Sequence, residues 1–268
     1  MLADLYPQVR MAAIAALEKL QPSGEWRQRL VYECYVPAGE FIMGDDQSGE
    51  KDESPAHKVY LNAYYIGKYP VTNAEYARYR QDLRQPFELP AGRENHPVGE
   101  VSWYDASDYA AWAGMRLLTE AEWEKAASWT PLSSPHFTGK WGERGGSKRR
   151  YPWGNTFDKN KCNTSESGIG TTTPVGQYSP QGDSPYGCAD MAGNVWEWCS
   201  SKFADYPYQP DDGREEMTGY FVGVLRGSSF YNGDRRARCA SRNSNTPYVR
   251  FDDLCFRVGA GVPSSSEL

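Results

Sequence analysis

The spacing of hydrophobic and polar positions predicts short helices and strands separated by long irregular segments. Near the N terminus, apolar residues from Val9 to Leu20 recur at helical spacing and share one face. We therefore expect a helix within residues 1–22, where the sequence resembles half of a HEAT-type repeat. Because such repeats must stack to bury their faces, a single helix is expected to dock on the following domain or to be a remnant of a larger ancestor. Residues 23–262 are expected to form the main domain, and residues 263–268 a flexible tail.

Alternating apolar positions predict strands further along the chain. Residues 31–43 alternate on both sides of a turn at residues 37–39, and residues 58–62 predict another strand. Residues 173–175 are expected to enter a further strand. By contrast, residues 129–150 are polar and rich in Ser, Gly and basic residues, which predicts a long surface loop ending in a solvated basic cluster.

Three helix starts are marked by residues that cap free backbone amides. Thr72 with Glu75 and Thr119 with Glu122 make two capping boxes, and Ser102 with Asp105 precedes a third helix over residues 106–113. Acidic residues recur at helix starts for this reason. Glu75, Glu122 and Glu124 are accordingly not interpreted as catalytic carboxylates.

Composition indicates an aromatic core. The 268 residues include 9 Trp, 19 Tyr and 9 Phe, with 26 Gly and 18 Pro, which favours an α+β domain with many turns over a helical bundle. Trp153, Trp196 and Trp198 are expected in the core. The net charge of -6, without a long basic run, excludes an electrostatic footprint for nucleic acid. No run of about 18 apolar residues is present, so we expect no membrane insertion and a cytoplasmic location.

The six cysteines, at positions 34, 162, 188, 199, 239 and 255, show no close metal-type pairing. Reduced thiols are expected, with a single disulfide bridge as the alternative. His57 is a lone histidine at the start of a strand, and a structural role is favoured.

Residues 187–198 read GCADMAGNVWEW and combine polar and large apolar side chains. Buried polar groups are costly unless something satisfies them. This segment therefore predicts either a bound cation or a dense hydrogen-bond network.

Eight segments in order resemble the formylglycine-generating enzyme, or sulfatase-modifying factor, family. They are VPAGEFIMG (36–44), ESPAH (53–57), YIGKYPVTN (65–73), PVGEVSW (97–103), RLLTEAEWE (116–124), YPWG (151–154), GCADMAGNVWEW (187–198), and VLRGSSF (224–230) with RCASR (238–242) and CFR (255–257). The resemblance implies an α+β fold, a variant of the C-type lectin fold with little regular secondary structure and two calcium sites. It does not imply that every member is an enzyme.

The resemblance also implies calcium ligands. Asn163, Thr164, Ser167 and Ile169 match one site, and Asp190, Gly193, Val195 and Glu197 match the other. Calcium takes carboxylate and backbone carbonyl oxygens, which explains why Gly, Val and Ile can occur. The first set departs from the family, because Ser167 stands where a carboxylate can occur and only Glu166 is nearby. In the alternative interpretation, Asp190, Asn194 and Glu197 hydrogen-bond loop amides.

The copper site of the family is not expected here. The resemblance implies two cysteine ligands, one shortly after a Gly-Gly-Ser-aromatic turn and one five residues further on, yet residues 227–237 contain no cysteine. Copper and oxidase chemistry are therefore expected to be absent. The related iron-dependent sulfoxide synthases use a histidine-rich helical domain, and residues 1–22 contain no histidine.

The C-terminal loops resemble the variable region of proteins diversified by retroelements. A codon for each of the loop residues listed next can be obtained from an Asn codon by changing only its adenines. The predicted ligand-binding positions are Tyr231, Asn232, Gly233, Asp234, Asn243, Ser244, Asn245, Tyr248, Val249, Phe251, Asp252 and Asp253. Tyr, Ser, Gly and Asn also make adaptable binding surfaces. Ordinary polar turns are the alternative, since such residues dominate turns.

The sequence thus predicts a non-catalytic protein that binds a protein or another macromolecule through this surface. An oxidoreductase of the same family with an altered site and a sensory or scaffold module of a signalling system remain as alternatives.

Overall fold

The computed structural model describes residues 33–130 and 146–262. The expected N-terminal helix, the first residues of the predicted strand at 31–43 and the expected tail lie outside these ranges. The helices are α3 (Asn73–Asp82), α4 (Trp103–Trp112) and α5 (Glu120–Ser128), with short 3-10 helices η1 (Lys51–Glu53), η2 (Lys159–Lys161) and η3 (Ser165–Ser167). The strands are β1 (Glu33–Val36), β2 (Gly39–Met43), β3 (His57–Leu61), β4 (Tyr64–Gly67), β5 (Arg116–Leu117), β6 (Trp129–Thr130), β7 (Ser147–Lys148), β8 (Trp196–Lys202), β9 (Gly223–Arg226), β10 (Arg242–Asn245), β11 (Leu254–Phe256) and β12 (Val258–Gly261).

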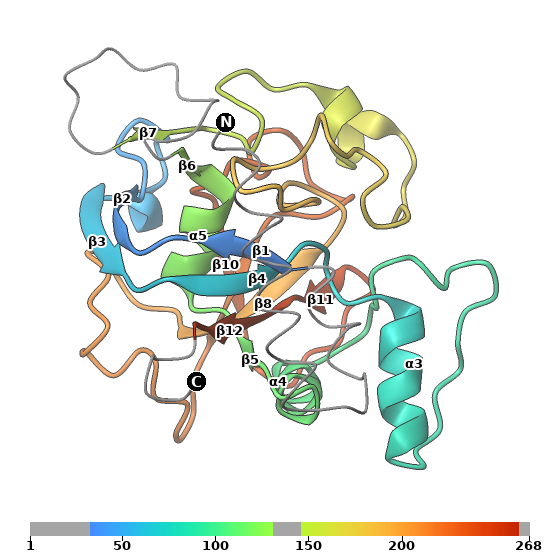
Figure 1. Cartoon of the computed structure of the whole chain (residues 1–268). Coiled ribbons are helices and arrows are strands. Elements are labelled where there is room, and N and C mark those ends of the chain that lie inside the picture. The colour runs from blue at the N-terminus through green and yellow to red at the C-terminus, as the bar shows by residue number, and fades with distance from the viewer. Residues whose placement is uncertain (1–32, 131–145, 263–268) are drawn as a thin grey trace, which may run out of the picture.

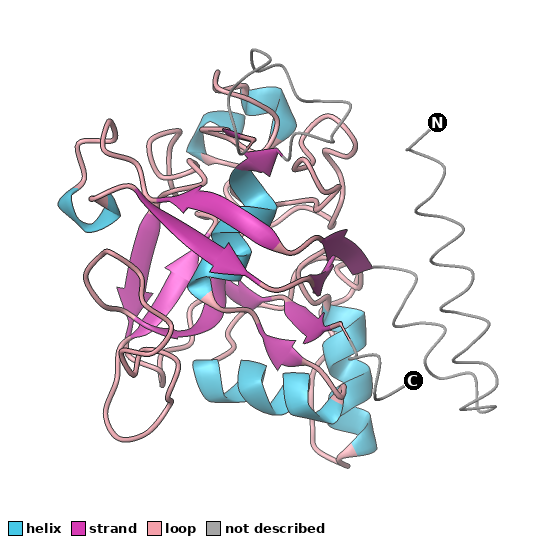
Figure 2. Cartoon of the chain, turned by 60° about the vertical axis from the view of Figure 1, so that its left-hand side comes forward, coloured by secondary structure: helices cyan, strands magenta, loops and turns pink. Residues whose placement is uncertain are grey.

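Two four-stranded sheets organise the described chain. One has the order β1-β4-β12-β5, and the other has the order β10-β9-β8-β11. In the first sheet all neighbouring strands are antiparallel. Its order places the last strand, β12, between the early strand β4 and the short strand β5. In the second, β11 runs parallel to β8, and β10 is an edge strand. Figures 1 and 2 show the strands grouped in the middle of the molecule, with much of the periphery made of loops.

Two of the three predicted helix starts, after Thr72 and Thr119, are confirmed. Thr72, Ser102 and Thr119 each cap a helix, and in all three cases the reciprocal bond of a capping box is present. The helix after Ser102 begins at Trp103, earlier than predicted. Each pair satisfies amides that a helix end leaves free.

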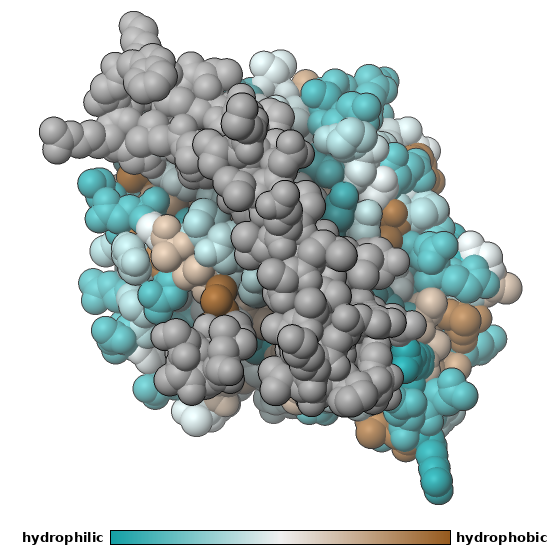
Figure 3. All heavy atoms as spheres, viewed as in Figure 1, coloured by the Kyte–Doolittle hydropathy of each residue, from teal (hydrophilic) through white to brown (hydrophobic). Residues whose placement is uncertain are grey.

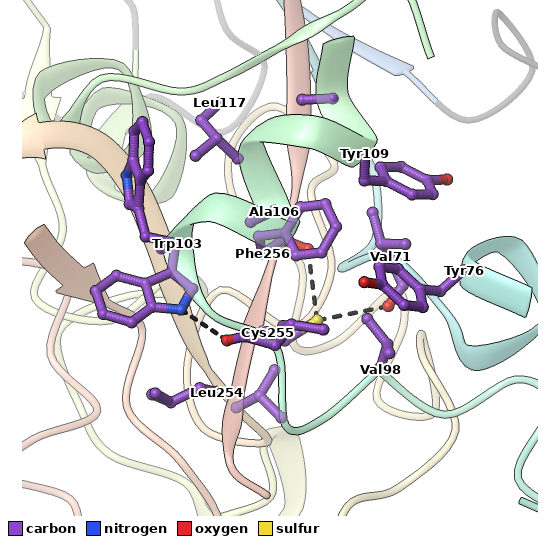
Figure 4. Close-up of a cluster of buried hydrophobic side chains, with 14 of the residues drawn as sticks. Val71, Tyr76, Val98, Trp103, Ala106, Tyr109, Leu117, Leu254, Cys255 and Phe256 are labelled. Carbon is purple, nitrogen blue, oxygen red and sulfur yellow. Dashed lines mark hydrogen bonds between the residues drawn. The ribbon is translucent and has the colours of Figure 1, made fainter. Parts of the chain in front are cut away.

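The core is aromatic, as the composition predicts. Trp196 and Trp198 are buried in its largest cluster, which α4 covers with Ala106 and Tyr109. Figure 4 shows part of this cluster, in which the Cys255 thiol contacts the carbonyl oxygens of Val71 and Phe256, each at 3.5 Å. Because the thiol finds carbonyl partners, a cysteine is tolerated in this apolar interior.

Two local predictions are wrong. Trp153 is only partly buried, since it stacks on Tyr151 at the edge of a small separate cluster. Residues 173–175 form no strand, because they lead into a run of turns that begins at Val175. In each case tertiary neighbours override a local pattern.

The coloured atoms in Figure 3 show a mostly hydrophilic face with hydrophobic residues in separate places. Within the described ranges, no helix has both the length and the apolar character needed to cross a membrane.

Candidate binding surface

Beneath the predicted binding loops lies a set of arginines that are buried against glutamates. We call Arg226, Arg238, Arg242 and Arg257 with their glutamate partners the buried frame. Arg242 pairs with Glu120 through Nε to Oε1 at 2.6 Å and Nη2 to Oε2 at 2.9 Å. Arg226 contacts both Glu120, at 3.5 Å, and Glu124. All four of these side chains are fully buried.

Glu124 corrects two details of the sequence analysis. Its carboxylate is no helix cap, because it binds Arg226 and accepts a hydrogen bond from Lys148 Nζ at 2.6 Å. Burial by itself would raise the pKa of Glu124, but Lys148 and Arg226 lower it to about 2. Lys148 therefore belongs to an ion pair and is not part of a solvated basic cluster.

The other two arginines of the buried frame join distant segments. Arg238 holds Glu53 through two bonds of 2.6 and 2.8 Å. Arg257 holds Glu197 through two bonds of 2.6 Å, while Trp123 Nε1 donates to the same carboxylate at 2.9 Å. Such bidentate hydrogen bonds fix both the distance and the angle between the two segments that they join.

Over this frame the predicted binding positions include strongly exposed aromatic side chains. Tyr231 is 58% exposed, Tyr248 68% and Phe251 50%. The Tyr231 hydroxyl donates to Asp252 Oδ2 at 2.9 Å. Because Asp252 directly follows Phe251, this bond joins the loop that carries Tyr231 to the segment 248–252.

The same segment reaches α4 at its other end. The rings of Tyr248 and Tyr104 lie 5.2 Å apart, and the Glu100 amide donates to the Phe251 carbonyl at 2.8 Å. Arg250 donates to Asp105 Oδ1 at 2.9 Å. Exposed side chains thus continue from the start of α4 to Tyr231.

Tyr104 and Arg250, which were not predicted from the sequence, extend this candidate surface. Tyr104 is 37% exposed on the second residue of α4, where it points away from the core side taken by Ala106 and Tyr109. The helical period of the sequence could have predicted this, because it places Tyr104 on the side of the helix opposite the core positions. We call the exposed residues Tyr104, Tyr231, Asp234, Asn243, Tyr248, Arg250, Phe251 and Asp252 the binding face.

Asn243, Ser244 and Asn245 lie in the edge strand β10 and not in a loop, which corrects the sequence analysis. They pair with Leu225, Val224 and Gly223 of β9. A strand with a solvent-exposed face can carry mostly polar side chains, and it then lacks the alternating apolar pattern by which strands are predicted. The Asn243 and Asn245 side chains accept from the amides of the residues that follow them, both at 2.9 Å.

Three predicted contact residues are turned partly inward. Asn232 Oδ1 accepts from Trp196 Nε1 at 2.9 Å and from Ser229 Oγ at 3.0 Å. Val249 packs against the main core cluster. Asp253 is partly buried, and burial raises the pKa of its carboxyl group. These side chains hold the loops in place and expose less surface than their neighbours.

The first predicted calcium segment supports the loop 231–234. Ser165 N donates to the Asn232 carbonyl at 2.9 Å, and Asp234 N donates to Glu166 Oε1 at 2.9 Å. A side chain at Gly233 would come within 2.8 Å of that same oxygen. The carboxylate nearest to the first calcium set is thus directed at the binding loop.

The first calcium set itself offers neutral oxygens. Asn163 Oδ1 accepts from Ser167 Oγ at 2.9 Å, and Ser167 Oγ accepts from Ile169 N at 3.3 Å. The Thr164 hydroxyl is buried without a hydrogen-bond partner among the described residues. Since calcium prefers carboxylates, these side chains by themselves fit it poorly.

The second calcium set is held by a dense hydrogen-bond network, one of the two predicted alternatives. Asp190 Oδ2 accepts from Gly176 N at 2.6 Å, and Asn194 Oδ1 accepts from Thr173 N at 2.9 Å. Gly193 has φ 75, and a Cβ there would lie 2.3 Å from the Asn163 carbonyl oxygen, so only glycine fits. Its amide donates to the Gly227 carbonyl at 2.8 Å.

The carboxylates of the second set differ in what they already bind. Glu197 is engaged by Arg257 and Trp123, whereas Asp190 has no cationic hydrogen-bond partner in the described chain. Burial raises the pKa of Asp190 to about 6. Of these two carboxylates, Asp190 is therefore the better candidate to bind a cation. No group of three or more His, Cys, Asp or Glu residues suited to a metal ion occurs within residues 33–130 and 146–262.

The two cysteines nearest to the family's copper segment are buried thiols. Cys239 contacts the Ala127 carbonyl at 3.5 Å, and burial raises its pKa to about 12. Burial also raises the pKa of Cys255. Soft metals require thiolates, which neither site favours.

Known proteins resemble the chain over most of its length. The model of the "Sulfatase-modifying factor enzyme 1-like domain" matches residues 20–260. The chain is 34% identical over 293 residues to the "Formylglycine-generating enzyme" of Streptomyces coelicolor, covering 83% of this chain and 87% of that protein. It is 29% identical over 330 residues to the "Inactive C-alpha-formylglycine-generating enzyme 2" of Mus musculus, covering 99% and 96%.

Some relatives are much longer than this chain. It is 32% identical over 254 residues to "Serine/threonine-protein kinase pkn1" of Chlamydia caviae, covering 85% of this chain but 38% of that protein. The chain spans 37% of a second such kinase, of Chlamydia pneumoniae, and 58% of the "Hercynine oxygenase" of Mycolicibacterium smegmatis.

Solved structures share the fold. "PvdO from Pseudomonas aeruginosa" matches with TM-score 0.67 and 28% identity, covering 86% of this chain and 94% of that one. "Treponema denticola variable protein 1" matches with TM-score 0.66 and 22% identity, covering 86% and 95%. These matches confirm the predicted α+β fold with few helices. From the match over residues 20–260, the chain belongs to the family of sulfatase-modifying factor enzyme 1-like domains.

Proposed function

We propose that this chain is a non-catalytic ligand-binding protein that presents the binding face on the rigid buried frame. The observation that carries the proposal is the continuous run of exposed side chains from Tyr104 through Tyr248 and Phe251 to Tyr231. Exposed aromatic rings supply large contact areas at a low cost in conformational entropy. Such rings are enriched where proteins bind proteins, so the expected ligand is a protein or another macromolecule.

The chemistry of the C-terminal segment supports a non-catalytic role. Residues 227–237 have no cysteine, and Asn232, shortly after the Gly-Ser-Ser-Phe turn, bonds Trp196 and Ser229. A relative that covers 99% of this chain is named as inactive. Copper loading with oxygen-dependent oxidation of a cysteine-containing peptide tests the alternative of an altered oxidoreductase, and turnover in that assay would refute this proposal.

Calcium is proposed as a brace for the loops below the binding face. Asp190 would hold it together with the carbonyl oxygens of Gly193 and Val195, and the ion would compensate the buried carboxylate. The loop that begins at Asn163 would be stabilised with it, since the Asn163 carbonyl accepts from Asn194 N at 2.7 Å.

The direct test is to sequence the 3′ end of the gene, with its flanking kilobases, across a population of the source organism. Diversification by a retroelement predicts substitutions confined to adenine-derived codons at positions such as Tyr231, Tyr248 and Phe251, together with a nearly identical template copy nearby. The codons of Arg226, Arg238 and Arg242 should be uniform. A uniform 3′ end without a template would refute diversification.

A display library tests binding separately. Variants randomised at Tyr231, Asn243, Tyr248 and Phe251 should stay resistant to protease and yield binders to different proteins. A matched library randomised at Arg226, Arg238 and Arg242 should lose protease resistance. If both libraries were equally sensitive to protease, the division between binding face and buried frame would be wrong.

The third function, a sensory or scaffold module, is favoured by one observation. The chain resembles a segment that makes up 38% of a protein named as a kinase. A module of that kind would use the same binding face, so the display test applies to it equally.

A further inference from the structure

Two cysteines far apart in the sequence come together beside the end of β4. Cys34 in β1 lies opposite Ile66 of β4, and Ala189 N donates to the Lys68 carbonyl just beyond that strand, at 2.9 Å. A Cβ on Gly187 would lie 4.0 Å from Cys34 Sγ. Cys34 packs against the buried cluster that contains Cys188, and each thiol shifts the pKa of the other.

The two thiols differ in their access to solvent. Cys34 is partly exposed, whereas Cys188 is completely buried, and both pack in the cluster that contains Tyr64 and Met191. The thiols of Cys239 and Cys255 contact backbone carbonyls instead. Cys34 is therefore the member of the pair that a reagent can reach.

Charges around Cys34 favour its thiolate. The neighbouring Cys188 thiol is the main cause that lowers the pKa of Cys34, and the positive charges of Arg257 and Lys68 add to it. Burial and the carboxylate of Asp183 oppose this shift. Arg257 is held in place by the carbonyls of Gly67, Lys68 and Ala189, at 3.0 to 3.1 Å. Because the thiolate is the nucleophile in sulfur chemistry, Cys34 is the more reactive sulfur.

We propose that Cys34 and Cys188 form a redox-active dithiol, with Cys34 as the attacking thiol and Cys188 as the resolving thiol. With a peroxide as oxidant, the Cys34 thiolate attacks one oxygen, the O–O bond breaks, and the departing hydroxide takes a proton to become water. The Cys188 sulfur then attacks the sulfenic sulfur of Cys34, the S–O bond breaks, and the second water leaves with the Cys188 proton. Two thiols and one hydrogen peroxide thus give one disulfide and two waters.

The disulfide would tie β1 to the segment just before β8. That segment carries Asp190 and Gly193, and the Gly193 amide donates to the Gly227 carbonyl, just before the loop that carries Tyr231. A disulfide between residues so far apart in the sequence lowers the conformational entropy of the unfolded chain, and it thereby stabilises the folded state.

Mass mapping of the untreated and peroxide-treated chain tests the proposal. Treatment with hydrogen peroxide should produce one linked pair of peptides, containing Cys34 and Cys188, and raise Tm by about 5 °C or more. Dithiothreitol should reverse both changes. Oxidation of Cys34 without a link to Cys188, or a link to another cysteine, would overturn the proposal.

Two variants and a control extend the test. Cys188→Ser should leave a sulfenic acid on Cys34 that dimedone traps, and Cys34→Ser should abolish both the link and the shift in Tm. Cys162→Ser, which alters a thiol in a separate cluster, should keep both. Dimedone labelling of Cys188→Ser at no more than the level of Cys162→Ser would contradict the assigned roles. If a variant fails to fold, the mapping of the unaltered chain still decides.

Discussion

Two sets of side chains alternate within residues 226–257, and they differ in nearly every physical respect. Arg226, Arg238, Arg242 and Arg257 are at most 1% exposed, whereas Tyr231, Tyr248 and Phe251 are at least half exposed. The arginines are paired with buried glutamates, so replacing one leaves an uncompensated charge. The aromatic residues make few obligatory contacts, so replacing them changes mainly the surface. One short stretch of chain thus combines a buried, ion-paired support with exposed aromatic side chains.

The largest expected effect comes from breaking the buried frame. Arg226→Ala leaves Glu120 and Glu124 with fewer cationic partners in a fully buried site. We expect a loss of about 3 to 5 kcal/mol in the free energy of unfolding, measured by urea denaturation.

A matched control is the surface pair Arg235 and Glu50, whose nitrogen and oxygen lie 2.9 Å apart. Arg235→Ala should cost less than about 1 kcal/mol, because solvent screens an exposed pair. Equal losses for the two variants would show that burial does not set the energy of these pairs.

A buried cation that has no anionic hydrogen-bond partner among the described residues should respond to pH in a different way. Lys125 Nζ donates to the carbonyls of Pro37 and Gly39, at 2.8 and 2.9 Å, and burial lowers its pKa to about 8. The folded state therefore binds this proton less tightly than the unfolded state, where the pKa is 10.5. The cost of the charge is fully present below pH 8 and disappears as pH rises towards 10.5.

The measurement is the stability of the unaltered chain relative to Lys125→Met. We expect this difference to shift by about 2 kcal/mol in favour of the unaltered chain between pH 7 and pH 10, a figure reduced for solvent screening. A flat difference would mean that the Lys125 ammonium is as well solvated as an exposed one.

Calcium offers a test of how the binding face is supported. Burial raises the pKa of Asp190 from 3.8 to about 6, so the folded state binds this proton more tightly than the unfolded state does. The stability gained from protonated Asp190 is therefore fully present below pH 3.8 and is lost as the pH rises to about 6. At pH 7 a cation would compensate the charged carboxylate. Calcium in 100-fold excess over its Kd should then stabilise the chain by about 2.7 kcal/mol.

Asp190→Asn is the control for this effect, because its side-chain oxygen can still accept from the Gly176 amide. Without calcium this variant should be as stable as the unaltered chain or more so at pH 7, and calcium should not raise its Tm. If calcium stabilised both proteins equally, or neither of them, Asp190 would not be a calcium ligand.

The smallest effect is expected on the binding face itself. Tyr231→Phe removes the exposed hydrogen bond to Asp252 and keeps the ring. Its free energy of unfolding should stay within about 0.5 kcal/mol of the unaltered value in urea denaturation. A loss above 1.5 kcal/mol would place Tyr231 with the buried frame.

The sequence by itself determined the family, the fold class and two of the three helix starts. Thr72 with Glu75 and Thr119 with Glu122 lie three residues apart, so the bonds that cap these helices are local and can be read from spacing. The exposed aromatic positions Tyr231, Tyr248 and Phe251 were also predicted, from their composition and their place between family segments.

Only the tertiary structure decided which partners the polar side chains take. The bonds of Arg238 to Glu53, Arg242 to Glu120 and Arg257 to Glu197 cross large parts of the chain, and no local pattern encodes them. The strand β10 (Arg242–Asn245) depends on pairing with β9, and its polar side chains give no alternating apolar pattern in the sequence. Local hydrogen bonds leave a signature in residue spacing, whereas long-range pairs depend on how the whole chain packs, and that is the physical reason for the division.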